Sequence, residues 1–234
     1  MIAENLAQIR EKIELRCEKS GRNADKIKLI AVTKYFGTDI IEEAVAAGLT
    51  DFGENKAQEL NLKYEKLGNK ITWHFIGTLQ KNKVKYAVKA AEFIHSVDSI
   101  ELADEVDARA GKLSKVQKIL LEVNTSSEES KTGLITEDDV FRLAEHCNKK
   151  NNLELIGLMT MAPFTDDEHV IRNSFSLLRS LKEKLIKNGF TKITELSMGM
   201  TNDYEIAVDE GATMLRIGSA IFGERDYSKD WREI

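Results

Sequence analysis

The stretch Lys28-Leu-Ile-Ala-Val-Thr-Lys34 places five apolar or β-branched residues between two lysines, and Gly37-Thr38 follow shortly after it. A short apolar run that is bounded by turn residues is typical of a strand buried on both faces. Glycine and threonine are frequent at the residue that precedes a helix. The stretch therefore predicts a strand over residues 28–33, a lysine at its carboxyl end, and a helix over residues 38–48.

The same unit, a short apolar run followed by a longer amphipathic stretch, recurs along the chain. Strands are predicted over residues 28–33, 51–54, 72–77, 93–97, 118–124, 154–160, 193–198 and 213–217. Helices are predicted over residues 3–19, 38–48, 55–67, 80–91, 99–113, 136–150, 168–188 and 202–210. Strands that alternate with helices pair in parallel through right-handed crossovers. We therefore expect an α/β fold, a (β/α)8 TIM barrel with an extra N-terminal helix, with a doubly wound open sheet as the alternative.

The composition is typical of one globular domain without a membrane-spanning segment. The 234 residues are 42% hydrophobic and 31% charged, and the chain contains a single proline and no linker-like tract. A net charge of −5 argues against a nucleic-acid-binding or anionic-membrane-binding surface. Cys17 and Cys147 form no CxxC pair, which favours free thiols in a reducing compartment. We expect a single domain over residues 1–234 and a cytoplasmic location.

Lys34 is the first candidate functional residue. A lysine at the end of a buried strand can occupy a partly desolvated pocket, which lowers its pKa because burial disfavours the charged form. The neutral amine can then form a Schiff base with an aldehyde. The alternative is that Lys34 ends the strand in solvent, as most lysines do.

The loops after the last two predicted strands carry residues suited to binding an anion. They are Ser197-Met-Gly199-Met-Thr201 and Arg216-Ile-Gly218-Ser219. In a (β/α)8 barrel these loops often bind phosphate, because glycines allow close approach, hydroxyls donate and helix N-termini attract anions. The alternatives are ordinary turns, with Thr201 as a helix N-cap and Arg216 as a surface ion-pair partner. A Schiff-base lysine together with a phosphate site indicates pyridoxal phosphate.

Seven segments in order along the chain resemble the pyridoxal phosphate homeostasis protein family. They are Ala31-Val-Thr-Lys34, Phe52-Gly-Glu-Asn55, Trp73-His-Phe-Ile-Gly77-Thr-Leu-Gln80-Lys-Asn82-Lys83, Ser130-Lys-Thr-Gly133, Gly157-Leu-Met-Thr-Met161, Ser197-Met-Gly-Met-Thr201 and Arg216-Ile-Gly-Ser219-Ala-Ile-Phe-Gly223. The resemblance covers nearly the whole chain. Thr33, Lys56 and Thr201 depart from it, because serine, tyrosine and serine are frequent at these positions.

The resemblance implies a barrel like the N-terminal domain of alanine racemase, with pyridoxal phosphate held on Lys34. It implies phosphate contacts from Ser197, Gly199, Thr201, Gly218 and Ser219, and Arg216 facing the pyridine nitrogen. A guanidinium is always protonated, so it favours the unprotonated ring, which supports carbanion chemistry weakly.

Two further residues are candidates for contact with the cofactor. His74 lies in the strand predicted over residues 72–77, and Asn55 follows the strand predicted over residues 51–54. The alternative for His74 is a buried histidine that is satisfied by protein groups. The four histidines show no metal-ligand spacing, so we expect no metal site.

Two classes of function remain. Racemisation needs an acid and a base on opposite faces of the substrate, and alanine racemase takes its second base from a tyrosine in a separate C-terminal domain. The present chain ends about a dozen residues after Gly223, and its five tyrosines offer no evident replacement. We therefore expect a monomeric, non-catalytic protein that buffers pyridoxal phosphate and delivers it to apo forms of pyridoxal-phosphate enzymes. The alternatives are an amino-acid racemase or related enzyme that uses this cofactor, and a Schiff-base aldolase without it.

Overall fold

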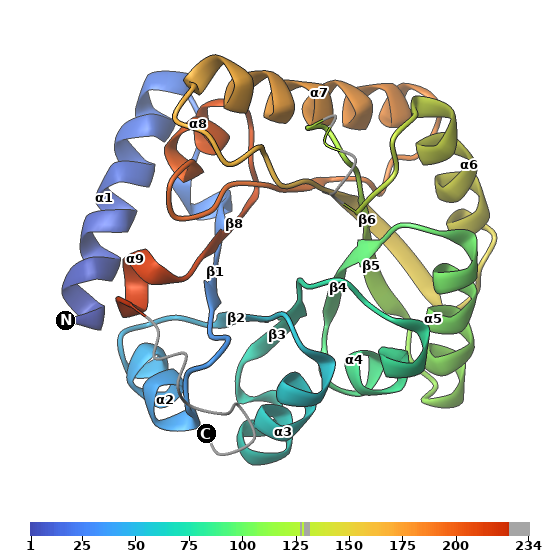
Figure 1. Ribbon diagram of the computed structural model, residues 1–234, viewed down its shortest axis with the longest axis horizontal. Helices are drawn as coiled ribbons and strands as arrows, with labels where there is room; N and C mark the ends of the chain where they lie inside the picture. Colours follow the sequence, from blue (N-terminus) through green and yellow to red (C-terminus); the bar gives the residue numbers. More distant parts are fainter. Residues whose placement is uncertain (127, 129–131, 225–234) are drawn as a thin grey trace.

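Eight parallel strands close into a barrel in the computed structural model, and helices surround it (Figure 1). The structure describes residues 1–126, 128 and 132–224. Each strand pairs with the next along the chain, and the last pairs with the first. The strands are β1 (Lys28–Val32), β2 (Asp51–Glu54), β3 (Thr72–Phe75), β4 (Phe93–Val97), β5 (Gln117–Glu122), β6 (Leu153–Met159), β7 (Glu195–Ser197) and β8 (Met214–Ile217). The predicted (β/α)8 barrel is confirmed, and the open sheet is excluded by the β1–β8 pairing.

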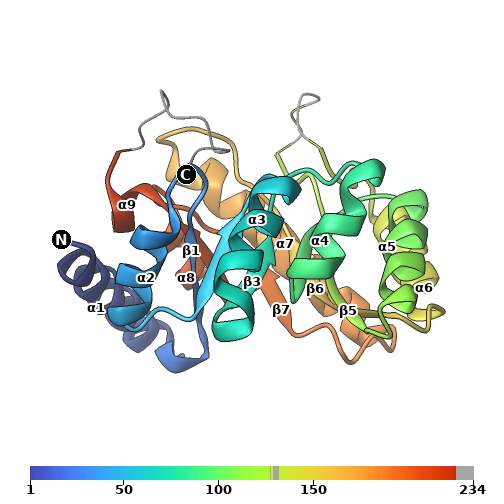
Figure 2. The same cartoon turned by 90° about the horizontal axis from the view of Figure 1, so that it is seen from below.

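The helices lie on the outside of the barrel. They are α1 (Ile2–Ser20), α2 (Thr38–Ala46), α3 (Ala57–Leu67), α4 (Val84–Ala90), α5 (Ile100–Lys112), α6 (Glu137–Asn148), α7 (Glu168–Lys187), α8 (Tyr204–Asp209) and α9 (Ser219–Phe222). The extra N-terminal helix, α1, lies against α8 and α9 at one flank of the barrel (Figure 2). No helix among the described residues combines the length and the apolar character that a membrane crossing requires.

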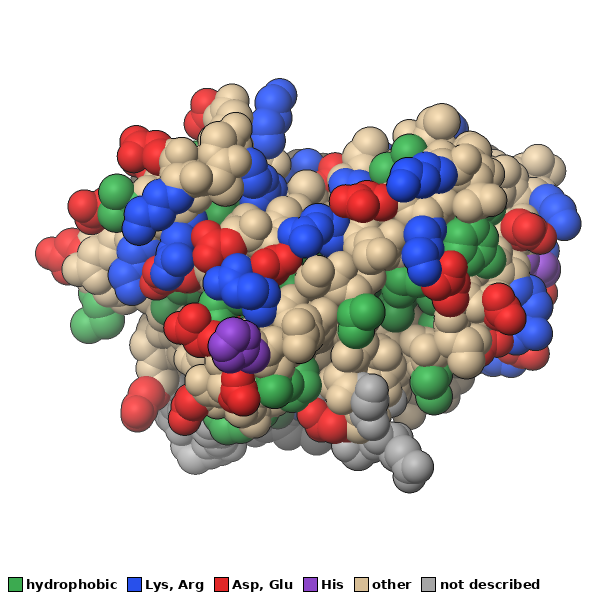
Figure 3. Space-filling model, turned by 90° about the horizontal axis from the view of Figure 1, so that it is seen from above, with side chains coloured by type: hydrophobic (Ala, Val, Ile, Leu, Met, Phe, Trp, Pro, Cys, Tyr) green, Lys and Arg blue, Asp and Glu red, His purple; other side chains and the backbone are tan. Residues whose placement is uncertain are grey.

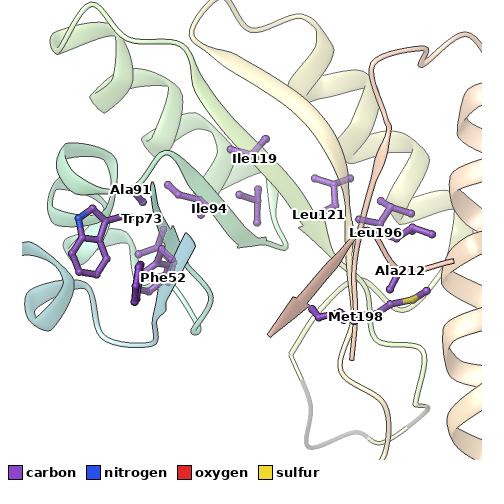
Figure 4. Packing of buried hydrophobic residues seen from close by; sticks show 14 of the residues in the cluster. Phe52, Trp73, Ala91, Ile94, Ile119, Leu121, Leu196, Met198 and Ala212 are labelled. Carbon is purple, nitrogen blue, oxygen red and sulfur yellow. The ribbon is translucent and has the colours of Figure 1, made fainter. Parts of the chain in front are cut away.

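Two apolar layers follow from the alternation of side chains along each strand. The outward-facing side chains pack under the helices, and Figure 4 shows part of this layer around Phe52, Trp73 and Ile94. A smaller cluster fills the barrel interior and consists of Ile30, Phe93, Leu120, Ile156, Met159 and Met214. This interior cluster closes the middle of the barrel, which leaves the strand ends as the places where a ligand can enter.

The surface carries both signs of charge. Basic and acidic side chains are interspersed over the face shown in Figure 3. Arg16, Arg172 and Arg179 pair with carboxylates of α8 and of the residue after it. Cys17 and Cys147 are buried free thiols.

Candidate functional site

A pocket of about 570 Å³ lies at the carboxyl ends of the strands. Its wall includes Lys34 after β1, Asn55 after β2, residues 161–166 after β6, residues 200–203 after β7, Arg216 of β8, Gly218 after it, and Ser219 at the start of α9. Residues from opposite ends of the chain meet here because β8 pairs with β1. The structure therefore brings together Lys34, Asn55, Thr201, Arg216, Gly218 and Ser219, which are six of the nine predicted cofactor-binding residues.

Lys34 is half-buried and stands immediately after Thr33, which is fully buried. The next residue, Tyr35, has a φ of 69°, a left-handed backbone conformation that is unfavourable for residues other than glycine. Lys56 covers Tyr35, with its Nζ 4.8 Å from the ring centroid and 3.3 Å from the phenolic oxygen. Lys56, one of the departures from the family pattern, therefore packs on the residue that follows Lys34.

The backbone on both sides of Lys34 is held by a buried ion cluster, which we call the Lys63 cluster and which consists of Glu54, Glu59 and Lys63. The Lys63 Nζ donates to the Thr33 carbonyl over 2.8 Å, to Glu54 Oε1 over 2.7 Å and to Glu59 Oε1 over 2.8 Å. The Thr33 hydroxyl donates to Glu54 Oε1 over 2.6 Å. The backbone N–H of Tyr35 donates to Glu59 Oε1 over 2.9 Å. The cluster thus bonds to the residue before Lys34 and to the residue after it.

Burial dominates the electrostatics of the Lys63 cluster. It raises the pKa of Glu54 to about 7, because the charge of Lys63 offsets the loss of solvation only in part and Glu59 adds repulsion. The second carboxylate oxygens of Glu54 and Glu59 are buried and have no hydrogen-bond partner among the described residues. The Glu54 carboxyl therefore takes up a proton near neutral pH.

The part of the pocket wall that follows β7 and β8 carries two hydroxyls. Ser219 Oγ lies 3.2 Å from Thr201 Oγ1, and Gly218 precedes Ser219 without a side chain that would limit access. Thr201 is not the N-cap of the following helix, because α8 begins at Tyr204 and its N-cap is Asp203. That alternative for Thr201 was wrong, and its hydroxyl lies on the wall of the pocket.

Arg216 contributes to the same wall from the barrel interior. Only 4% of the residue is exposed, so its interpretation as a surface ion-pair partner was wrong. Its guanidinium donates to Ser197 Oγ over 2.6 Å and to the Thr160 carbonyl over 2.8 Å. Burial lowers the pKa of Arg216 to about 10, and Asp203 and Glu122 act in the opposite direction. The group is therefore a buried cation at neutral pH.

A chain of hydrogen bonds, which we call the barrel chain, runs from Arg216 through Ser197, His95 and His74 to Asp51. His95 Nδ1 lies 2.9 Å from Ser197 Oγ, its Nε2 lies 2.9 Å from His74 Nδ1, and His74 Nε2 lies 2.9 Å from Asp51 Oδ1. Asp51 lines a second pocket, at the amino ends of the strands. The barrel chain therefore crosses the barrel from one end to the other.

The protons of the barrel chain are fixed by its two ends. An ionised Asp51 can only accept, so His74 donates through Nε2 and accepts at Nδ1 from His95. His95 then accepts at Nδ1 from the Ser197 hydroxyl, whose oxygen accepts from Arg216. Burial lowers the pKa of His74, against the opposing effect of Asp51, and lowers that of His95 well below its usual value. Both imidazoles are therefore neutral, and every hydrogen bond of the chain points toward Asp51.

Three predicted cofactor-binding residues do not line the pocket. His74 is buried inside the barrel, and both of its ring nitrogens are bonded to protein groups. Ser197 is also fully buried, and its only hydroxyl proton is directed to His95. Gly199 has a φ of 93°, and a Cβ there would lie 2.5 Å from the Cβ of Ala207, so this glycine allows close packing against α8. The structure gives these residues roles in supporting the pocket wall.

Asn55 lies on the pocket wall with an unsatisfied group. Its Oδ1 atom is buried and has no hydrogen-bond partner among the described residues. Buried polar atoms are nearly always bonded, so an unpaired acceptor on a pocket wall is suited to a ligand that donates a hydrogen bond. Asn55 was predicted to reach the site from the end of β2, and its position on the pocket wall agrees with that prediction.

Sequence reasoning missed the residues that support the site. Lys63 shares a face of α3 with Leu60 and Leu67 at spacings of three and four residues. A lysine in an apolar stripe is a signal that could have marked it as buried and paired. His95 carried no such signal, because one of the two residues that it bonds, Ser197, is 102 positions away on a strand across the barrel. The segment 161–166, with Phe164 95% exposed at the pocket rim, was also missed.

Comparison with known proteins places this chain in a family. The model for the alanine racemase N-terminal domain matches residues 4–226. A pyridoxal phosphate homeostasis protein of Aquifex aeolicus is 40% identical over 96% of this chain and 98% of its own length. The human protein of the same name is 42% identical over 96% of this chain and 86% of its own length.

Solved structures agree with these matches. PipY of Synechococcus elongatus, in a structure described as having pyridoxal phosphate bound, superposes with a TM-score of 0.83 at 34% identity and covers 95% of this chain and 100% of PipY. An alanine racemase of Clostridium difficile superposes with a TM-score of 0.74 at 17% identity over 97% of this chain and 56% of the racemase, which shows a shared fold alone. By the domain match and the full-length identity, the chain belongs to the alanine racemase N-terminal domain family and, within it, to the pyridoxal phosphate homeostasis proteins.

Proposed function

We propose that this protein binds pyridoxal phosphate as a Schiff base on Lys34 and acts in the homeostasis of this cofactor by storing and releasing it. One observation carries the proposal: the lysine amine, a buried cation and two hydroxyls lie on the walls of one pocket, at the strand ends where barrels bind their ligands. The family of the chain and the ligand reported for PipY support the same conclusion.

The residues of the pocket fit the chemical groups of pyridoxal phosphate. When bound, the cofactor supplies an aldehyde that condenses with a primary amine and releases water. Lys34 is the amine in this pocket. Thr201, Gly218 and Ser219 suit the phosphate, because two hydroxyls can donate and the glycine leaves room. The unpaired Oδ1 of Asn55 offers an acceptor to the ligand.

Arg216 suits the pyridine nitrogen. It stays protonated and directs two of its donors to protein groups, which fixes its position. A cation beside that nitrogen keeps the ring unprotonated and limits its capacity to accept electrons from a substrate carbanion. This arrangement supports storage of the cofactor over racemisation.

We also propose that the protein is a carrier without a turnover of its own, rather than an amino-acid racemase. A racemase needs a second acid–base group across the substrate from the lysine. Among the described residues, no tyrosine and no histidine lines the pocket. The proposal includes a cytoplasmic location, a monomeric state, and apo forms of pyridoxal-phosphate enzymes as recipients of the cofactor.

Transfer of the cofactor tests this function. The loaded protein is mixed with an apo pyridoxal-phosphate enzyme, and the recovery of that enzyme's activity is followed over time. We expect recovery with the wild-type protein and none beyond the rate given by traces of free cofactor with a Lys34→Ala protein treated in the same way. Racemisation or decarboxylation of amino acids by the loaded protein alone, at ordinary enzymatic rates, contradicts the carrier function.

A further inference from the structure

We propose that Lys63 is a positioning residue for the Schiff-base lysine: through the Lys63 cluster it sets the backbone on both sides of Lys34 and thereby the place of the Lys34 amine. This inference rests on the proposed function and adds to it the device that prepares the lysine for the aldehyde. Lys63 belongs to α3, outside the barrel, and does not line the pocket.

The Lys63 ammonium uses all of its hydrogen-bond donors within the cluster and on Thr33. Its three protons match three acceptors, which are the Thr33 carbonyl, Glu54 and Glu59, at 2.7 to 2.8 Å. The side chain is 4% exposed, and those of its two carboxylate partners are 0% and 2% exposed. Burial of all three side chains favours one well-defined geometry, because water has little access to replace a lost hydrogen bond.

The cluster controls the chain direction at Lys34. Thr33 is held by two hydrogen bonds: its carbonyl accepts one from Lys63, and its hydroxyl donates one to Glu54. Tyr35 is held through its N–H by Glu59 in a left-handed conformation that a tyrosine does not adopt without support. Because both neighbours of Lys34 are fixed, its Cα and the direction in which its side chain leaves the backbone are fixed as well.

Stability alone does not account for the Lys63 cluster. Burying two carboxylates and an ammonium costs solvation, and well-packed apolar side chains of similar volume often stabilise a protein equally well. The contacts of this cluster, however, fall on the residues directly before and after Lys34. Strained backbone next to a reactive group is a common form of preorganisation.

The test compares the rate at which the cofactor becomes covalently attached to Lys34 with the total amount of cofactor bound. Protein and pyridoxal phosphate are mixed, borohydride is added at intervals, and the covalent adduct on Lys34 is measured beside the total bound cofactor. For Lys63→Met we expect total binding close to that of the wild type and covalent capture slowed by about tenfold or more, because small misplacements of a reacting group have effects of this size. Lys63→Arg is expected to recover part of the rate.

Lys89→Met is the matched control, because Lys89 makes an exposed ion pair with Glu65 on α3. It is expected to capture the cofactor at the wild-type rate. A purely structural role for Lys63 predicts a lower melting temperature with an unchanged ratio of captured to bound cofactor, and that result would overturn the inference. If Lys63→Met does not fold, Thr33→Val removes the single bond from the Thr33 hydroxyl to Glu54, and it must slow capture by a few fold for the inference to stand.

The inference and the proposed function fail in different ways. If the wild-type protein forms no adduct on Lys34, the proposed function fails. If the wild type forms the adduct and Lys63→Met forms it at the same rate, only the role of Lys63 is disproved.

Discussion

Two buried polar networks flank the pocket, and they are built on opposite principles. The Lys63 cluster gathers two carboxylates and one ammonium in a small volume beside β1 and β2. The barrel chain separates its charges, with Arg216 at one end, Asp51 at the other and three neutral groups between them. The first network holds the backbone around Lys34, and the second holds the side chain of Arg216.

Each network suits the group that it supports. The Lys34 amine must be placed accurately to react, and the residues on both sides of it are fixed by short hydrogen bonds to charged groups. The Arg216 cation stays protonated and fixed in position, because it is bonded to a neutral hydroxyl and a carbonyl that do not neutralise it. The two networks are expected to respond differently to mutation and to pH.

The largest effect is expected from breaking the charged network. Lys63→Met leaves two carboxylates buried without their cation, and removal of one partner of a buried ion pair costs about 3–5 kcal/mol. Urea unfolding of Lys63→Met should show a loss of this size, and Lys89→Met should change the free energy of unfolding little. Equal stability of Lys63→Met and the wild type would show that the cluster is not the tight network described above.

A smaller effect is expected from breaking the neutral network. His95→Leu removes a donor to His74 and an acceptor for Ser197, and buried groups left unpaired cost about 1–3 kcal/mol each. The same urea experiment measures this loss. If His95→Leu destabilises the protein more than Lys63→Met does, the contrast between a charged and a neutral network is wrong.

Variation of pH separates the two networks by the sign of their effect. The pKa of Glu54 is raised by burial from 4.5 to about 7, so the folded protein binds more protons than the unfolded chain between these values. The stability from Glu54 is therefore full below pH 4.5 and is lost as the pH rises through about 7. In Glu54→Gln, which does not titrate, this loss of stability should be absent from the pH profile measured by thermal unfolding.

The histidines of the barrel chain change the stability of the protein with pH in the opposite direction from Glu54. Burial lowers the pKa of His74 and of His95 below 6.5, so the unfolded chain binds more protons below that pH. Their contribution is full above pH 6.5 and is lost as the pH falls through their folded pKa values. His95→Leu should flatten the acid side of the profile and leave the loss toward pH 7 in place. A variant that changes both sides equally would contradict the independence of the two networks.

The smallest effect concerns two serines, Ser197 at the end of β7 and Ser219 at the start of α9. Ser219→Ala removes a hydroxyl on the pocket wall, and we expect weaker binding of pyridoxal phosphate by about 0.5–1.5 kcal/mol, measured by equilibrium titration. Ser197→Ala removes a proton that is directed to His95, so it should act mainly on stability. If Ser197→Ala weakens binding more than Ser219→Ala does, Ser197 contacts the phosphate, as the resemblance implied.

The fold was predictable because its signal is local. The run of apolar residues before Lys34 and the longer amphipathic stretches fix strands and helices, and eight such units have one common solution in a closed barrel. The prediction missed the start of α8, which begins at Tyr204 because Asp203, and not Thr201, is its N-cap. The single domain over residues 1–234 stays a prediction. Ser130, in one of the quoted family segments, and Tyr227, one of the five tyrosines, lie outside the described residues.

The site was predictable only in part, because its supporting contacts are long-range. Gly218 and Ser219 follow a strand directly, so their position at the pocket could be read from the strand. For His74, a nearly continuous apolar strand does not show which side chains face inward, and the resemblance alone pointed to the cofactor. Its partners, Asp51 and His95, come from neighbouring strands and become evident only when the barrel closes.

The most direct test of Lys34 as the cofactor-binding lysine is borohydride reduction of the protein loaded with pyridoxal phosphate, followed by peptide mapping. We expect one stable adduct, on Lys34, and no adduct in the same peptide of a Lys34→Ala protein that still folds. An adduct on another lysine in the wild-type protein, with Lys34 unmodified, would contradict it.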